Sequence, residues 1–105
     1  MEQIKYIIKE RTEKIVLPKT LGFGQIFTDH IFEMDYTKDK GWHNPTIKPL
    51  ENLQMHPAMS VIHYGQSIFE GLKAFKTIND EIVIFRPDVH IQRLNNSARR
   101  ICMPE

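Results

Sequence analysis

The side chains that most often bind metals or act as nucleophiles are scattered along this sequence. No two of the five histidines lie three to five residues apart, the spacing that places two ligands on one face of a helix. These histidines are His30, His43, His56, His63 and His90. The one cysteine, Cys102, falls on an apolar helical face, where we expect a small core residue rather than a nucleophile. The sequence therefore predicts no metal site.

A second set of reactive and apolar side chains is concentrated in the C-terminal half. Arg93 lies in a helical pattern, and a guanidinium fork suits a phosphate dianion, although the same pattern also fits an ordinary solvated arginine. The rings of Tyr64 and Phe69 suit either an apolar pocket or plain core packing. Glu70 and Lys73 are three residues apart, which predicts a solvated ion pair rather than an acid and base.

Two hairpins and a helix are predicted around these residues. Phe32, Met34 and Tyr36 alternate with polar residues, which predicts a half-buried strand, and residues 39–41 predict the turn after it. The return strand begins at Trp42, and two prolines make residues 45–49 more typical of an edge strand or loop. A second hairpin is expected at residues 72–86, whose apolar run at 82–85 predicts a strand covered on both faces.

Helical segments are predicted on either side of the second hairpin. Residues 66–71 predict one or two helical turns that end at Gly71. Pro87 and Asp88 favour the start of a longer helix that continues to Met103, with one apolar face. Together these elements predict an α+β fold, a curled antiparallel sheet with packed helices. Because that apolar face needs cover, we expect the chain to be part of a longer protein.

Composition and charge exclude several classes of protein. Hydrophobic residues make up 41% and charged residues 26%, so a globular chain is expected rather than a disordered one. The net charge of +1 gives no reason to expect nucleic acid or a membrane as a partner. Charged residues throughout positions 1–20 exclude a secretory signal there, and a single cysteine favours a reducing compartment. We expect residues 1–20 to form an arm, with a helical turn or flexible stretch at 9–14, in a soluble cytoplasmic protein.

Several ordered segments resemble the branched-chain amino acid aminotransferases, which are fold-type-IV enzymes dependent on pyridoxal phosphate. The resemblance covers about residues 20–105. The matching segments are residues 63–75, His-Tyr-Gly-Gln-Ser-Ile-Phe-Glu-Gly-Leu-Lys-Ala-Phe, and residues 85–100, which begin Phe-Arg-Pro-Asp. Residues 23–30, 39–42 and 52–57 also match. The resemblance implies that residues 21–105 are part of the small N-terminal domain, and that a large domain carrying the cofactor lysine lies further along the protein.

The resemblance also implies roles for single residues. In this family the arginine that matches Arg93 binds the phosphate of pyridoxal 5'-phosphate. Tyr64 and Phe69, together with Phe23, match aromatic residues that line the substrate side-chain pocket. No catalytic residue is implied within this chain, since the Schiff-base lysine lies downstream and Lys73 does not correspond to it.

The implied reaction is transfer of the amino group of leucine, isoleucine or valine to 2-oxoglutarate, in a cytoplasmic homodimer. Two other fold-type-IV enzymes are alternatives, D-amino acid aminotransferase and aminodeoxychorismate lyase. An alternative of another class is a non-catalytic binding or dimerisation module. The segments at Phe23 and Trp42 favour the branched-chain type.

Overall fold

The computed structural model describes residues 2–7 and 15–105, and these residues form two compact units. The first unit is Met1–Gln54 and the second is Met55–Glu105. The turn or flexible stretch predicted at residues 9–14 lies outside the described residues. Helix and strand are both present, which confirms the α+β class. The predicted single antiparallel sheet is wrong, because the strands form a three-stranded and a two-stranded sheet.

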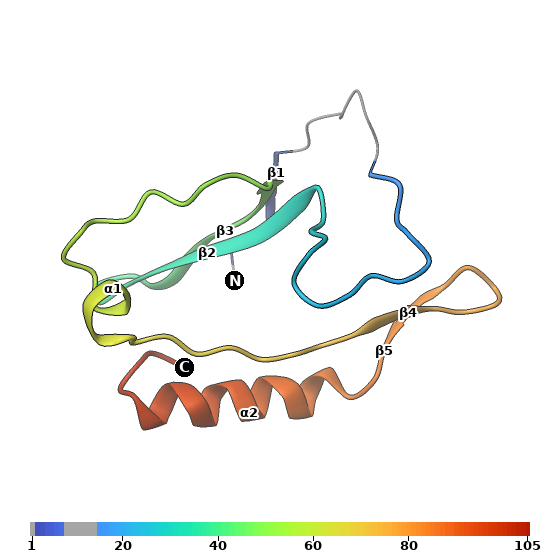
Figure 1. Ribbon diagram of the computed structural model, residues 1–105. Coiled ribbons are helices and arrows are strands. Elements are labelled where there is room, and N and C mark those ends of the chain that lie inside the picture. Colours follow the sequence, from blue (N-terminus) through green and yellow to red (C-terminus); the bar gives the residue numbers. More distant parts are fainter. Residues whose placement is uncertain (1, 8–14) are drawn as a thin grey trace. The chain divides into compact units, whose positions relative to one another are not determined.

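The hairpin of the first unit is formed by β2 (His30–Thr37) and β3 (Gly41–Pro49) (Figure 1). Its turn is the predicted one, and Gly41 has a φ of 69°, a conformation that glycine adopts at no steric cost. Beside the turn, the rings of Tyr36 and Trp42 lie opposite each other and meet edge to face, with centroids 5.3 Å apart. The predicted burial of the apolar face of β2 is wrong, because Phe32 is 56% exposed.

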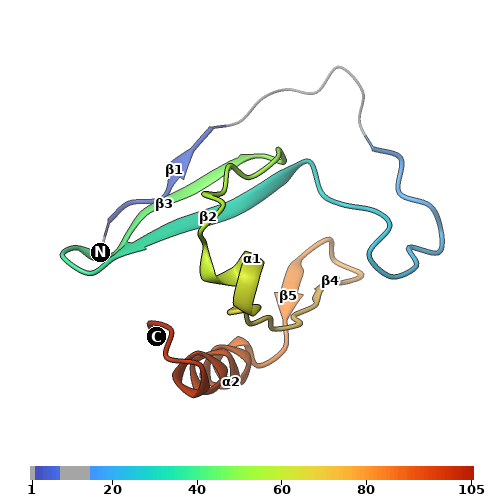
Figure 2. The same ribbon diagram turned by 60° about the vertical axis from the view of Figure 1, so that its left-hand side comes forward.

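β3 is the central strand of its sheet, so the prediction of an edge strand or loop at residues 45–49 is wrong. The short strand β1 (Lys5–Tyr6) pairs in parallel with Thr46 and Ile47 of β3. Figure 2 shows β1 beside β3. The N–H of Ile7 also donates to the carbonyl of Ile47 at 2.8 Å. The two prolines of β3 are compatible with this position because the pairing with β1 is confined to residues between them.

A β-bulge interrupts β3 beside the first of these prolines. The register shifts between Glu33 and Asp35 on β2, and Asn44 on β3 has a φ of 56°. Asparagine tolerates this left-handed conformation better than most residues. The backbone N–H of Asn44 donates to the carboxylate of Glu2 at 2.7 Å, and its side-chain amide donates to Asp35 at 3.0 Å. Two carboxylates therefore accept hydrogen bonds from the backbone and the side chain of the bulged residue.

The second unit begins with the short helix α1 (Ser60–Tyr64). Gly65 follows it with a φ of 62° and ends the helix in the left-handed conformation. The helix predicted at residues 66–71 is therefore wrong, because the glycine that terminates a helix here is Gly65 and not Gly71. Residues 65–73 form an irregular extended segment instead.

The predicted second hairpin is confirmed as β4 (Ala74–Lys76) and β5 (Ile82–Ile84). In its turn, the hydroxyl of Thr77 accepts hydrogen bonds from the N–H groups of Asn79 and Glu81. The prediction that its apolar run is covered on both faces is wrong, because Ile82 is 67% exposed. A two-stranded hairpin has no neighbouring layer of its own to cover these side chains.

The helix α2 (Pro87–Arg100) confirms the predicted long helix. Pro87 and Asp88 lie in its first turn, and two arginines lie in its last turn, where their charge complements the helix dipole. Ala98 on this helix is buried, and Pro45 of β3 is the one other buried apolar residue among the described residues. Cys102 lies after the helix with a φ of 56° and is exposed, so its predicted place in the core is wrong.

Among the described residues, no helix is long and apolar enough to cross a membrane.

Candidate functional site

The extended segment of residues 65–73 runs alongside α2 in the second unit (Figure 1). Polar contacts join the segment to the helix at two places. The side-chain amide of Gln66 donates to the carbonyl of Ile101, just past the end of α2, at 3.0 Å. Glu70 contacts the helix nearer its start, through two side chains one turn apart. The segment is thus fixed to the helix at two points.

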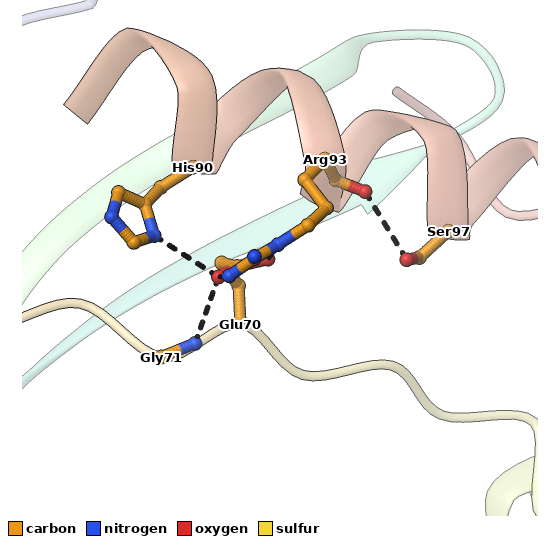
Figure 3. A network of polar contacts seen from close by, with 5 residues as sticks. All are labelled: Glu70, Gly71, His90, Arg93 and Ser97. Carbon is orange, nitrogen blue, oxygen red and sulfur yellow. Dashed lines mark hydrogen bonds and ion pairs between the residues drawn. The ribbon is translucent and has the colours of Figure 1, made fainter. Parts of the chain in front are cut away.

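Glu70 is the centre of the polar network shown in Figure 3. Arg93 of α2 binds its carboxylate through two nitrogens, with Nε 2.7 Å from Oε2 and Nη2 on Oε1. His90, one helical turn earlier, lies with its Nδ1 3.1 Å from Oε1. The backbone N–H of Gly71 donates to the same oxygen at 3.1 Å. The carboxylate therefore has partners on both the helix and its own segment.

These contacts stabilise the charged form of Glu70. Hydrogen bonds from Arg93 and then from His90 lower the pKa of the Glu70 carboxyl to about 2. The pKa of Arg93 is raised by the same pair. The Glu70 side chain is 11% exposed, whereas that of Arg93 is 64% exposed. The pair therefore consists of a largely covered carboxylate that is charged at neutral pH and a guanidinium that extends into solvent.

The predicted ion pair between Glu70 and Lys73 is replaced by this network. Residues three apart share a face only in a helix, and residues 65–73 are not helical. Sequence reasoning missed Arg93 and His90 as the partners of Glu70, which lie 23 and 20 residues away. The spacing of His90 and Arg93, one turn apart on the predicted helix, was the available signal that both could bind one carboxylate.

Arg93 keeps donors for a further acceptor. Its guanidinium has five N–H groups, and Glu70 engages it through Nε and Nη2 alone. No hydrogen bond or ion pair joins its Nη1 nitrogen to a described residue of the chain. An anion such as a phosphate could therefore bind the outer edge of the guanidinium without displacing Glu70.

The three aromatic residues predicted to line a pocket are all highly exposed. Tyr64 is the last residue of α1 and is 87% exposed, and Phe69 in the extended segment is 91% exposed. Phe23 is 100% exposed, between two glycines with positive φ. Tyr64, Phe69 and Arg93 belong to the second unit and Phe23 to the first. Within this chain none of the three rings packs in a core, and their place in a substrate pocket stays a prediction.

An open depression of about 520 Å³ adjoins the polar network in the second unit. It is lined mainly by apolar side chains of the hairpin and extended segment, together with His90. Its lining residues are Gly71, Leu72, Lys73, Phe75, Phe85 and His90. None of the predicted pocket residues lines this depression.

No cluster of three or more histidine, cysteine, aspartate or glutamate side chains suited to a metal ion is present among residues 2–7 and 15–105.

Comparison with known proteins gives the strongest information on identity. The chain is 51% identical over 88 residues to branched-chain-amino-acid aminotransferase 2 of Bacillus subtilis, which covers 84% of the chain and 24% of that protein. It is 41% identical over 102 residues to the cytosolic branched-chain-amino-acid aminotransferase of Saccharomyces cerevisiae, covering 97% of the chain and 27% of the relative. The sequence belongs to the branched-chain amino acid aminotransferase family.

Other members of the branched-chain aminotransferase family match equally well. The cytosolic enzyme of Rattus norvegicus is 49% identical over 88 residues, covering 84% of the chain and 21% of that protein. No family model matches the chain. The chain spans about a quarter of the length of the curated relatives that it matches.

Proposed function

We propose that this chain is a segment of a pyridoxal-phosphate-dependent branched-chain amino acid aminotransferase. The whole protein would transfer the amino group of leucine, isoleucine or valine to 2-oxoglutarate, giving glutamate and a branched 2-oxo acid. The observation that carries this proposal is 41% to 53% identity to relatives with this name across 83% to 97% of the chain. The fold-type-IV architecture, the arm at residues 1–20 and the small domain at residues 21–105 are part of the same proposal.

The residues of the second unit fit the phosphate of pyridoxal 5'-phosphate. Arg93 offers the outer edge of an exposed guanidinium, and charge-assisted hydrogen bonds of this kind suit a phosphate dianion. When bound, the cofactor would supply the electron sink for the reaction. Arg93 would hold the phosphate in place, and the lysine that binds the cofactor covalently would lie elsewhere in the whole protein.

Tyr64 and Phe69 would form an apolar wall for the substrate side chain, with Phe23 as a further aromatic residue. Their exposure supports this role, because a pocket wall faces solvent before the substrate binds. A branched aliphatic side chain gains about 0.8 kcal/mol for each CH₂ group buried against such rings. These residues would therefore contribute affinity for leucine, isoleucine and valine rather than the chemistry itself.

We infer the cellular location of the whole protein from the same relatives. The yeast and rat proteins are both named cytosolic, which supports a cytoplasmic location for the whole protein. A homodimer is the assembly that the family resemblance implies.

A substrate survey of the whole protein tests this function. The protein, saturated with pyridoxal phosphate and supplied with 2-oxoglutarate, is assayed for glutamate formation from each amino donor. We expect leucine, isoleucine and valine to be used and D-alanine to be inactive. Activity with D-alanine alone would favour a D-amino acid aminotransferase, and conversion of aminodeoxychorismate would favour the lyase. Failure to turn over any of these substrates would favour a non-catalytic module.

A further inference from the structure

The polar network of Figure 3 gives Glu70 a role that sequence comparison does not assign. Its carboxylate accepts hydrogen bonds from the Nε and Nη2 atoms of the Arg93 guanidinium. That two-point contact fixes both the position and the plane of the guanidinium, because two parallel hydrogen bonds leave it little rotational freedom. An unpaired arginine with the same exposure would sample many rotamers.

Two further groups fix the position of the Glu70 carboxylate. The ring of His90 and the backbone N–H of Gly71 both contact Oε1 at 3.1 Å. The carboxylate is therefore fixed to its own segment and to the helix that carries Arg93. It is well suited to act as a rigid support rather than as a mobile surface charge.

We propose that Glu70 is a positioning residue that orients Arg93 toward the phosphate of the cofactor. This inference rests on the proposed function, in which Arg93 binds that phosphate. Glu70 binds the Nε and Nη2 side of the fork, so the Nη1 edge is presented to the anion. Glu70 does not contact the phosphate, because the negative charges of the carboxylate and the phosphate would repel each other. Its contribution is to hold Arg93 in the conformation that binds.

The test measures binding of two probes to the whole apo-protein, pyridoxal 5'-phosphate and pyridoxal, which lacks the phosphate. In Glu70→Gln, we expect the dissociation constant for pyridoxal phosphate to rise by about tenfold, the lower end of the loss that follows removal of a residue that orients a metal ligand. The dissociation constant for pyridoxal should change by less than about twofold. A general structural defect would weaken both probes alike.

The chain offers a matched control in an ion pair of Arg99, which lies on the same helix. Glu105 binds Arg99 through the same two nitrogens, with Nε at 2.8 Å and Nη2 at 2.6 Å, but this pair includes neither Arg93 nor Glu70. Glu105→Gln should leave the affinity for both probes unchanged. Glu70→Asp keeps the charge and should restore part of the lost affinity for pyridoxal phosphate.

A double variant separates the failure of this inference from that of the proposed function. If Glu70 acts through Arg93, Glu70→Gln should cause no further loss in an Arg93→Ala background. Unchanged affinity in Glu70→Gln, with a clear loss in Arg93→Ala, would overturn the role of Glu70 alone. Unchanged affinity in both single variants would overturn the phosphate role of Arg93 as well. Equal losses for the two probes in Glu70→Gln would make Glu70 a structural residue and overturn its positioning role.

Discussion

Glu70 and its partners show how a local electrostatic arrangement is fixed by a few side chains. The carboxylate is nearly covered and carries charge-assisted hydrogen bonds, whereas its partner arginine reaches solvent. A neutral glutamine could not keep both contacts with the guanidinium, because its amide nitrogen is a donor. The charge of Glu70 is therefore essential to the arrangement.

The network makes a testable contribution to the pH dependence of stability. The pKa of Glu70 is about 2 in the folded chain, against 4.5 for an ordinary glutamate. Since the folded pKa is the lower one, the stabilisation is complete above about pH 4.5 and is lost as the pH falls from there toward 2. The Tm difference between the wild-type whole protein and Glu70→Gln should be present at pH 7 and shrink markedly by pH 3. A difference that is the same at both pH values would contradict this account.

Substitution of Phe69 can distinguish a role in the substrate pocket from a role in the core. A ring that is 91% exposed has little packing to lose, so Phe69→Ala should destabilise the whole protein by far less than the roughly 3–5 kcal/mol typical of a buried phenylalanine. The kcat/KM for leucine and valine should fall more than that for alanine, because only branched substrates reach the missing ring.

A matched control for Phe69 is Phe85, which is also well exposed, at 78%, and has no predicted role in the substrate pocket. Phe85→Ala should leave the ratio of leucine to alanine turnover unchanged. Equal losses for all substrates in Phe69→Ala, in step with a lower Tm, would instead make Phe69 a structural residue.

At the scale of elements, α1 depends on the glycine that follows it. Gly65 has a φ of 62°, whereas Gly71 has no such constraint, and neither would bring an added Cβ within 4 Å of another group. Gly65→Ala should therefore destabilise the whole protein by about 1–2 kcal/mol through backbone strain alone. Gly71→Ala should stay within about 0.5 kcal/mol of the wild type. Urea unfolding compares the two, and an equal effect of both substitutions would show that helix termination at Gly65 does not matter.

The elements that the sequence predicted correctly are those determined by neighbouring residues. The turn residues predicted both hairpins, and Pro87 with Asp88 predicted the start of α2. The missed features depend on contacts between distant residues or on a choice between similar signals. β1 pairs with Thr46 and Ile47, about forty residues further along the chain, and no local sequence pattern predicts this pairing. Gly65 and Gly71 look alike as helix terminators, and only the backbone φ distinguishes them.

In the candidate site, too, contacts between distant residues could not be predicted from local patterns. Arg93, Tyr64 and Phe69 are predicted from segments that resemble a known family, because a family pattern reflects contacts between residues far apart in the sequence. Glu70 was assigned the wrong partner because local spacing was applied to a segment that is not helical. The pairing of Glu70 with α2 required the position of the helix relative to the segment, and that position is a tertiary feature.

At the scale of the whole chain, apolar exposure is the dominant property. Ala98 and Pro45 are the buried apolar residues among the described residues, and β5 and the predicted pocket rings are open to solvent. Hydrophobic burial is the main source of folding free energy, so little of it is available to the 105-residue chain alone.

We therefore expect the 105-residue chain by itself not to retain the cofactor. Within it, Arg93 is the one residue assigned to the phosphate, and a single charged contact contributes about 1.5–3 kcal/mol, too little for tight binding. The chain is incubated with pyridoxal phosphate and desalted, and its absorbance is recorded beside that of the whole protein. A persistent stoichiometric cofactor band in the short chain would contradict this prediction.

The proposed contact between Arg93 and the phosphate of pyridoxal 5'-phosphate can be tested through the dissociation constant of that cofactor in the whole protein. Arg93→Ala should raise it roughly ten- to a hundredfold, the equivalent of one lost charged hydrogen bond. Arg100→Ala, an exposed arginine of the same helix, serves as the control and should leave it within about twofold. An unchanged dissociation constant in Arg93→Ala, with the protein folded, would show that this arginine is not a phosphate ligand.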